Sequence, residues 1–263
     1  MLLEIDRLSV SYRDESGTVT SAARGVDLRL DRGEILGLVG ESGSGKSSVS
    51  MSVARLLPSP PAFYPEGRIL LDGEDVLAMP LGRLREIRGR KVGVIFQDPM
   101  GSLSPLWRIG SQMMETVLLH ERVSRAAARA LALEWLGKVQ LADPATVFNA
   151  WPHELSGGMQ QRVMIAMAMM LGPDLVIADE PTTALDVTVQ AEILKLMKSL
   201  ISRDSGVLLI SHDLGVVANM ATRLAVMRKG EIVERSDDVG AFFAAPAHPY
   251  SQALVREARR MSV

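Results

Sequence analysis

Hydrophobic and polar residues alternate along the first 35 positions of the chain. The segments LLEIDRLSVSY and VTSAARGVDLRL flank a polar turn at DESG, residues 14–17. Short alternating runs joined by a glycine-containing turn are typical of antiparallel strands. The N-terminal part is therefore predicted to form an antiparallel β subdomain.

Nearly continuous apolar runs follow, and these favour strands that are buried on both faces of a parallel sheet. They are EILGLVG (34–40), KVGVIFQ (91–97), DLVIADE (174–180) and GVLLISHD (206–213). Helical patterns lie between them. In VTVQAEILKLMKSL the apolar residues recur at helical spacing: Val189, Ile193, Leu196, Met197 and Leu200. Strands that alternate with helices predict a doubly wound α/β sheet.

One stretch, residues 109–139, reads as helical throughout and interrupts this alternation. Ser124 is a candidate N-cap, and Leu131, Trp135 and Leu136 share a predicted helix face. We therefore expect one domain over 1–263. Its α/β core takes 1–100 and 159–263, and an inserted helical subdomain takes 101–158.

Composition narrows the function classes. The chain has 263 residues, 47% of them hydrophobic, a net charge of −2 and no cysteine. The absence of cysteine excludes disulfides, thiolate metal sites and iron–sulfur clusters, and it fits a reducing compartment. The charge favours neither nucleic acid nor an anionic membrane as the main partner. The basic run RLREIRGRK (83–91) lacks interleaved aromatic residues, so we interpret it as a solvated helix face.

The hydrophobic segments are too short or too polar to suggest membrane insertion. Glu4 and Asp6 interrupt the first apolar stretch, which argues against a signal peptide. The longest apolar run, VMIAMAMML (163–171), is about half of the ~20 residues that a membrane span needs. We expect a cytoplasmic protein whose membrane role, if any, depends on a partner.

The strongest chemical signal is a phosphate loop between a predicted strand and a predicted helix. GESGSGKS fits the pattern G-x4-G-K-[ST] at every specified position. Glycines let backbone N–H groups turn toward phosphate oxygens at the positive end of the helix. We expect Lys46 to reach the β- and γ-phosphates and the Ser47 hydroxyl to bind Mg²⁺. The predicted nucleotide contacts are Gly40, Glu41, Ser42, Gly43, Ser44, Gly45, Lys46, Ser47 and Ser48.

Two carboxylates end the predicted strand LVIADE. Asp179 is the expected Mg²⁺ carboxylate of a phosphate-loop ATPase, and Glu180 is the candidate general base for the attacking water. Gln97 and His212 end two other predicted strands. Taken singly, each of these last two is an ordinary surface residue. Because functional groups gather at the carboxyl ends of parallel strands, we expect them to meet at one edge of the sheet.

A second glycine-containing helix start lies more than a hundred residues downstream, at LSGGMQQR (155–162). Ser156 can cap the helix, and Gly157 and Gly158 allow an anion to approach its N–H groups. A simple helix cap is the alternative. One nucleotide already has a phosphate loop, so we interpret this segment as serving a nucleotide held by another copy of the fold.

These motifs, in this order and spacing, resemble ATP-binding-cassette (ABC) ATPases over essentially the whole chain. The resemblance implies a RecA-like phosphate-loop core with an antiparallel β subdomain and a helical subdomain. It also implies a head-to-tail dimer in which Ser156, Gly157 and Gly158 contact the partner's ATP. Tyr12 is implied to stack on adenine. Gln97 and His212 are implied to contact the γ-phosphate and water, Gln97 also Mg²⁺, and Asp186, in the loop TALD (183–186), to connect the two subunits.

Further segments resemble the ATPases of oligopeptide, dipeptide and nickel importers. They are VIFQDPMGSLSPLWRIG (94–110), DEPTTALDVTVQAEIL and AFFAAPAHPYSQALV (241–255). Many such proteins continue into a cysteine-bearing extension with an iron–sulfur cluster, and this chain has no cysteine to hold one. The resemblance implies ATP hydrolysis with Mg²⁺ that energises uptake of a di- or oligopeptide, or of nickel or a metallophore.

The implied partners are a second ABC ATPase subunit, two transmembrane permease subunits and, indirectly, an extracytoplasmic solute-binding protein. The second ATPase is expected to be homologous but distinct, with a homodimer as the alternative. The implied location is the cytoplasmic face of the inner (plasma) membrane. A soluble ABC ATPase of translation or DNA repair is the alternative function, but no second cassette or long coiled coil is visible. A phosphate-loop kinase or GTPase has no use for LSGG.

Overall fold

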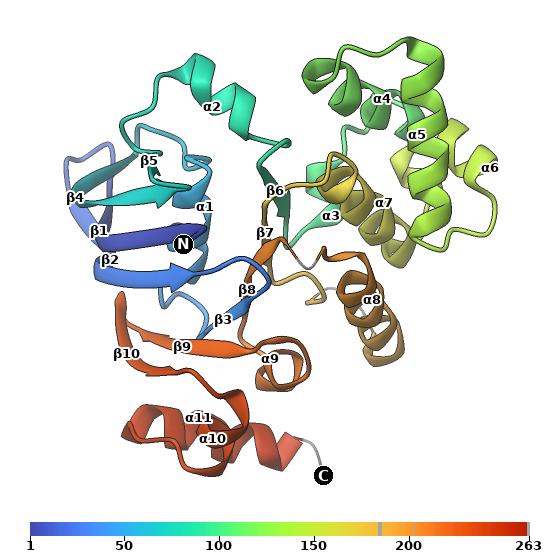
Figure 1. The fold of residues 1–263 in the computed structure, drawn as a ribbon. Coiled ribbons are helices and arrows are strands. Elements are labelled where there is room, and N and C mark those ends of the chain that lie inside the picture. Colours follow the sequence, from blue (N-terminus) through green and yellow to red (C-terminus); the bar gives the residue numbers. More distant parts are fainter. Residues whose placement is uncertain (184–185, 203, 262–263) are drawn as a thin grey trace. The chain divides into compact units, whose positions relative to one another are not determined.

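The computed structural model describes residues 1–183, 186–202 and 204–261 (Figure 1). They divide into two compact units. Unit 1 comprises Met1–Arg85 and Arg203–Val263, and unit 2 comprises Glu86–Ser202. Each unit is described by itself below.

The N-terminal part of unit 1 is an antiparallel sheet, as its alternating pattern predicts. Its strand order is β2-β1-β4-β5, and these strands span Leu3–Arg13 (β1), Val19–Leu30 (β2), Ala62–Leu71 (β4) and Glu74–Asp75 (β5). Leu3, Ile5, Leu8 and Val10 of β1 are all buried, so apolar residues on β1 supply one face of the core. Between β1 and β2, the predicted turn closes with a hydrogen bond from Gly17 N–H to the Asp14 carbonyl.

The rest of unit 1 contains four neighbouring strands of a second sheet, in the order β10-β9-β3-β8. These are β3 (Ile35–Val39), β8 (Gly206–Ser211), β9 (Arg223–Arg228) and β10 (Glu231–Ser236). Strand β3 runs parallel to β8 and β9, and β10 pairs with β9 in antiparallel fashion. All residues of β3 and β8 are buried, which explains why their sequences show no polar alternation. The helices of unit 1 are α1 (Lys46–Val53), α9 (Leu214–Met220), α10 (Val239–Ala244) and α11 (Pro249–Met261). Helix α2 (Leu81–Ile87) begins in unit 1 and ends just beyond its boundary at Arg85.

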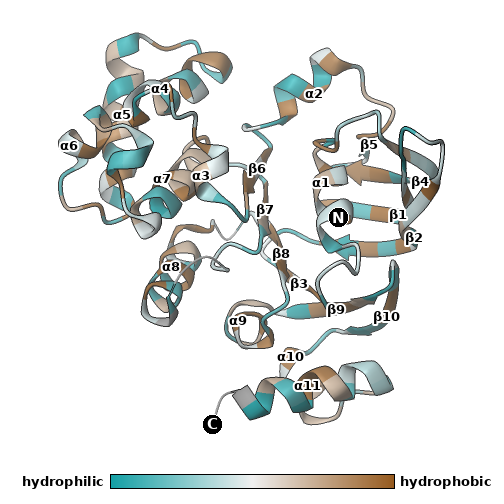
Figure 2. Cartoon of the chain, turned by 180° about the vertical axis from the view of Figure 1, so that it is seen from behind, coloured by the Kyte–Doolittle hydropathy of each residue, from teal (hydrophilic) through white to brown (hydrophobic). Residues whose placement is uncertain are grey.

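Unit 2 combines a parallel strand pair with a set of helices. The strands are β6 (Val92–Ile95) and β7 (Leu175–Asp179), and Figure 2 colours β7 as hydrophobic, in keeping with its five buried residues. The helices are α3 (Pro99–Ser102), α4 (Ile109–His120), α5 (Arg125–Lys138), α6 (Pro144–Asn149), the 3-10 turn η1 (Pro152–Glu154), α7 (Gly157–Met169) and α8 (Val187–Leu200). Helices α4, α5 and α6 pack against one another, and α7 contacts β6 (Figure 1).

The predicted α/β class, with antiparallel β and helical parts, is confirmed, and some details differ. Ser124 caps α5 as expected, because its hydroxyl accepts a hydrogen bond from Ala127 N–H at 3.1 Å. The buried face of α5 is Ala128, Ala132 and Leu136, whereas Leu131 and Trp135 are only half-buried. Small alanines allow α5 to pack closely there. Within the described ranges, no helix is both long and apolar enough to cross a membrane.

Candidate functional site

The phosphate loop connects β3 to α1 and is shaped by its glycines. Gly45, the N-cap of α1, has φ 104°, and Gly40 has φ 155°. A Cβ atom at Gly40 would lie 2.1 Å from the Met227 carbonyl oxygen, and one at Gly45 would lie 2.1 Å from that of Ala22. Neither distance can be tolerated, so packing within unit 1 requires both glycines.

Lys46 is buried inside this loop, with 4% of its surface exposed. Its Nζ donates hydrogen bonds of 2.8 Å to the carbonyl oxygens of Gly40 and Glu41. No side chain caps the start of α1 in the described part of the chain. The backbone N–H groups and positive dipole of that turn therefore suit an anion, and the loop fits a phosphate group.

Tyr12 and His212 lie beside the phosphate loop in unit 1. The Tyr12 hydroxyl and the Ser48 Oγ are 3.0 Å apart, which places Tyr12 at the first turn of α1. In the parallel pairing of β3 with β8, Val39 is opposite Ser211. The exposed His212 follows β8 directly, just as the phosphate loop follows β3. The predicted gathering of residues after parallel strands is confirmed for these two strands.

Gln97 and Glu180 meet in the same way in unit 2. Gln97 Nε2 donates to Glu180 Oε2 at 3.0 Å, and the Thr183 hydroxyl donates to the same oxygen at 3.0 Å. Strand β6 ends at Ile95, so Gln97 lies two residues beyond the strand and does not end it as predicted. The longer connection gives its side chain the reach to contact Glu180.

Glu180 has an unusual backbone conformation, with φ 47°. A non-glycine residue in the left-handed region stores strain, and such residues cluster at functional sites. The preceding Asp179 ends β7 and is 5% exposed. Two adjacent carboxylates are thus held in different environments, as their predicted separate roles require.

The LSGG segment begins α7 in unit 2. Ser156 caps the helix, with its Oγ accepting from Met159 N–H at 3.4 Å. A Cβ atom at Gly157 would meet nothing within 4 Å, whereas one at Gly158 would lie 3.1 Å from Val189 Cγ1. Ser156 and Gly157 are exposed. The chain's own packing therefore gives no reason for glycine at 157.

Asp186 has a local structural role that the sequence did not suggest. Its carboxylate accepts a hydrogen bond of 3.0 Å from Val189 N–H and so caps α8. Residues 184 and 185 of the loop TALD lie outside the described residues. Asp186 itself is exposed at the start of α8.

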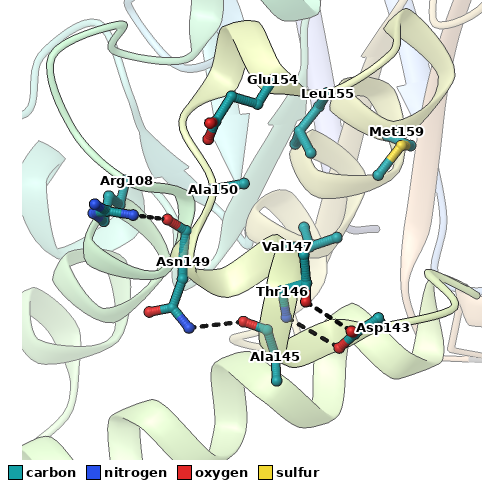
Figure 3. Close-up of a pocket in the computed structure, with 10 residues that line it drawn as sticks. All are labelled: Arg108, Asp143, Ala145, Thr146, Val147, Asn149, Ala150, Glu154, Leu155 and Met159. Atoms are coloured by element: carbon teal, nitrogen blue, oxygen red, sulfur yellow. Dashed lines mark hydrogen bonds between the residues drawn. The ribbon is translucent and has the colours of Figure 1, made fainter.

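A hollow of about 590 Å³ lies beside the start of α7, entirely within unit 2. Figure 3 shows Leu155 and Met159 on one side of it and the segment from Asp143 to Asn149 on another. Arg108 donates a hydrogen bond to the Asn149 carbonyl, and its guanidinium lies over the Trp151 ring at 5.1 Å. These contacts tie the residues before LSGG to α4.

Sequence reasoning missed two residues that contact the site. Thr183 binds the candidate base Glu180, and nothing in its local sequence indicates this. The other is Tyr250, in the tail AFFAAPAHPYSQALV, whose hydroxyl accepts a hydrogen bond of 3.0 Å from Glu41 N–H in the phosphate loop. Residues 41 and 250 are too far apart along the chain for any sequence pattern to connect them.

Comparison with known proteins gives consistent matches. The family model described as ABC transporter matches residues 23–183. The oligopeptide transport ATP-binding protein OppD of Bacillus subtilis (strain 168) is 48% identical over 255 residues, which cover 97% of this chain and 71% of that protein. The dipeptide transport ATP-binding protein DppD of the same organism is 44% identical over 263 residues, 100% of this chain and 78% of that one.

A solved structure of similar fold is the dimeric post-hydrolysis state of the ATP-binding cassette MJ0796, bound to ADP and Pi. It has a TM-score of 0.79 and 28% sequence identity, with 89% of this chain and 98% of that chain covered. The match extends the agreement from sequence motifs to the path of the backbone.

Proposed function

This chain belongs to the ABC transporter family as one of its ATP-binding subunits, and we propose that it hydrolyses ATP to drive uptake of a di- or oligopeptide. The family resemblance carried by the sequence motifs is confirmed. The geometric observation that most supports ATP binding is the buried Lys46, held in a glycine-shaped loop at an uncapped helix start.

We assign nucleotide contacts to the phosphate loop, residues 40–48, and to Tyr12. The loop's backbone N–H groups bind the β- and γ-phosphates, and Lys46 neutralises their charge. Tyr12 stacks on the adenine, which agrees with its position at the first turn of α1.

The oxygen donors of Ser47, Asp179 and Gln97 fit Mg²⁺, which prefers hydroxyl, carboxylate and amide oxygens. Ser47 is exposed on the first turn of α1, and Asp179 is the last residue of the buried strand β7. When bound, Mg²⁺ offsets negative charge on the transferred phosphoryl group. Ser47 and Asp179 would hold the ion, and Gln97 would contribute its amide oxygen.

Glu180 orients and deprotonates the attacking water. In the described structure its Oε2 accepts two hydrogen bonds, from Gln97 and Thr183, and these fix the direction of the carboxylate. His212 contacts the γ-phosphate and stabilises the charge that develops there. The strained backbone at Glu180 is consistent with a base that is held in position before substrate arrives.

The LSGG segment acts on the nucleotide of a second ATPase subunit. Ser156, Gly157 and Gly158 present the start of α7, and the open space at Gly157 supports approach by a group from outside the chain. The similar cassette MJ0796 is dimeric with ADP and Pi bound, which supports the same arrangement here. Asp186 then joins the two subunits. The proposed second subunit is a homologous but distinct chain, and a homodimer is the alternative.

A docking surface for permease subunits lies on unit 2 near Gln97. Large apolar side chains are exposed there, on or next to the segment that follows β6: Phe96, Met100, Leu106 and Trp107. Such residues in one short segment favour contact with another protein. Closure of the ATPase dimer moves these surfaces and so drives two transmembrane subunits, which receive solute from an extracytoplasmic binding protein. With these partners, the proposed location of the chain is the cytoplasmic face of the inner (plasma) membrane.

Di- or oligopeptide is the proposed solute because OppD and DppD are named for oligopeptide and dipeptide transport. Nickel or a metallophore is the competing solute. The test is to reconstitute the chain with its co-purifying permease and binding proteins in vesicles and to measure ATPase stimulation. Stimulation by short peptides supports the proposal, and stimulation by Ni²⁺ alone would overturn it.

The ATPase mechanism is tested by Glu180→Gln in the same complex. We expect ATP binding to be retained, turnover to fall by at least roughly 100-fold, and closed dimers to accumulate on size-exclusion chromatography. Unchanged turnover would remove Glu180 from the role of base.

A further inference from the structure

The peptide group between Gly40 and Glu41 makes a hydrogen bond on each side. Its carbonyl oxygen accepts from Lys46 Nζ at 2.8 Å. Its N–H donates to the Tyr250 hydroxyl at 3.0 Å. In a planar trans peptide the two groups point in opposite directions, so a contact that fixes one also fixes the other. Tyr250 is linked to Lys46 through a single peptide plane.

The Tyr250 side chain is itself firmly held. Its residue is 7% exposed, and the Arg228 guanidinium lies 4.7 Å from the centre of its ring. The ring therefore has little freedom to move its hydroxyl away from Glu41. Arg228 ends β9, which is directly paired with β3, the strand that enters the phosphate loop.

The turn before Tyr250 is anchored as well. The Glu234 carboxylate accepts hydrogen bonds from Ala247 N–H at 2.8 Å and His248 N–H at 2.9 Å. Tyr250 N–H donates to His248 Nδ1 at 3.1 Å. These contacts fix the start of α11 to β10, so the hydroxyl is presented to the loop from a rigid support (Figure 1).

The Tyr250 hydroxyl is protonated, as its contact with the phosphate loop requires. Burial raises the pKa of Tyr250, and the nearby Glu41 carboxylate contributes to that increase. The phenol therefore keeps its proton at neutral pH, and its oxygen is an acceptor for the Glu41 N–H.

We propose that Tyr250 is a positioning residue for Lys46, acting through the Gly40–Glu41 peptide. Lys46 donates to the carbonyl oxygens of Gly40 and Glu41, and these two carbonyl groups precede and follow the Glu41 N–H that Tyr250 holds. Without the hydroxyl, the peptide can rotate and the ammonium group loses its fixed direction. This inference rests on the proposed function, because it assumes that Lys46 binds the phosphates of ATP.

The test is Tyr250→Phe in the full 263-residue chain, with MgATP as the probe. The ring and its contact with Arg228 are retained, so only the hydroxyl is lost. Because one hydrogen bond contributes modestly to a net free energy, we expect the Kd for MgATP to rise roughly threefold to tenfold. In the assembled transporter, KM for ATP rises by a similar factor and kcat changes less than about twofold.

Gln252→Leu is the matched control in the same helix. Gln252 Nε2 donates to the Pro246 carbonyl at 3.1 Å and so supports the tail without contacting the phosphate loop. This variant should leave the Kd unchanged. An equal rise in both variants would mean that the tail acts only as general support and would overturn the proposal.

Lys46→Ala separates this inference from the proposed function. If Tyr250 acts through Lys46, adding Tyr250→Phe to Lys46→Ala produces no further rise in the Kd. A fully additive effect, or an unchanged Kd in Tyr250→Phe alone, overturns the positioning role while the ATP site stands. If Lys46→Ala itself leaves MgATP binding intact, the proposed nucleotide site fails as well.

Discussion

The glycines at the starts of α1 and α7 are there for different reasons. At α1, Gly40 and Gly45 have positive φ values, and their missing Cβ atoms leave room for carbonyl oxygens of the chain itself. At α7, Gly157 has open space around it and its φ is not positive. The α1 start is uncapped, whereas Ser156 caps the α7 start. The glycines at the start of α1 are required by packing within the chain. The space at Gly157, at the start of α7, is not filled by the chain's own described residues.

Gly45→Ala should give the largest effect at the α1 start. The new methyl would lie 2.1 Å from the Ala22 carbonyl oxygen, and φ 104° is strained for alanine. We expect MgATP binding to be lost and the free energy of unfolding to fall by about 1–3 kcal/mol, measured by urea denaturation. Gly82→Ala is the control, since its Cβ meets nothing within 4 Å and its φ is ordinary. Equal effects of the two changes would contradict the packing argument.

Gly157→Ala should leave the chain's stability and its own MgATP binding intact but lower ATP hydrolysis by the dimer. The methyl has room, so the free energy of unfolding should stay close to that of the original chain. The Kd of the chain's own site for MgATP should stay within about twofold of the original. ATP hydrolysis by the assembled dimer should fall at least roughly tenfold, because the methyl blocks approach to the α7 N–H groups. Steady-state ATPase assays of the complex provide the measurement. Full activity in the dimer would remove the cross-subunit role of this glycine.

Ser156→Arg sharpens the same point by adding bulk and charge. When the variant is paired with an unaltered partner, hydrolysis at the partner's phosphate loop should be abolished while ATP binding at Lys46 of the variant persists. Single-site nucleotide trapping with a photoreactive ATP analogue distinguishes the two sites. Loss of labelling at Lys46 of the variant itself would contradict the assignment to the partner's nucleotide.

Ser156→Ala tests how much of the α7 start is simple capping. Loss of the N-cap hydrogen bond should lower the free energy of unfolding by about 0.5–2 kcal/mol. Ser124→Ala at α5 removes an equivalent contact and should cost a similar amount. Only the Ser156 variant should also lower dimer ATPase activity, by a smaller factor than Gly157→Ala. Identical ATPase activity in both variants would mean that Ser156 acts only as a helix cap.

A smaller effect, on the pH dependence of stability, should be confined to unit 1, which carries the phosphate loop. Burial raises the pKa of Glu234, but the nearby Ser251 hydroxyl and the hydrogen bonds from Ala247 and His248 N–H outweigh this effect and lower the pKa below its ordinary 4.5. The ionised carboxylate therefore stabilises unit 1 above about pH 4.5, and this is lost as pH falls through the folded-state pKa. The difference in melting temperature between the original chain and Glu234→Gln should shrink on acidification below that pH. A difference that does not vary with pH would contradict this role of the charge.

Most elements were predictable because local patterns decide them. Alternation indicated β1 and β2, continuous apolar runs indicated β3, β7 and β8, and helical spacing gave α8 its bounds of Val187–Leu200. Where local signals conflicted, the boundaries moved. Strand β6 ends at Ile95, two residues before Gln97.

The sequence by itself determined the chemical motifs of this protein: a phosphate loop, paired carboxylates and a second glycine-bearing helix start. Each can be recognised because its residues are adjacent in the chain. Only the tertiary structure decided what lies against them. It brought Gln97 onto Glu180 across 83 positions of the chain, and it placed Tyr250 on the N–H of Glu41 across 209. The physical reason is that such contacts depend on how strands and helices pack across long sequence separations, which no local periodicity records.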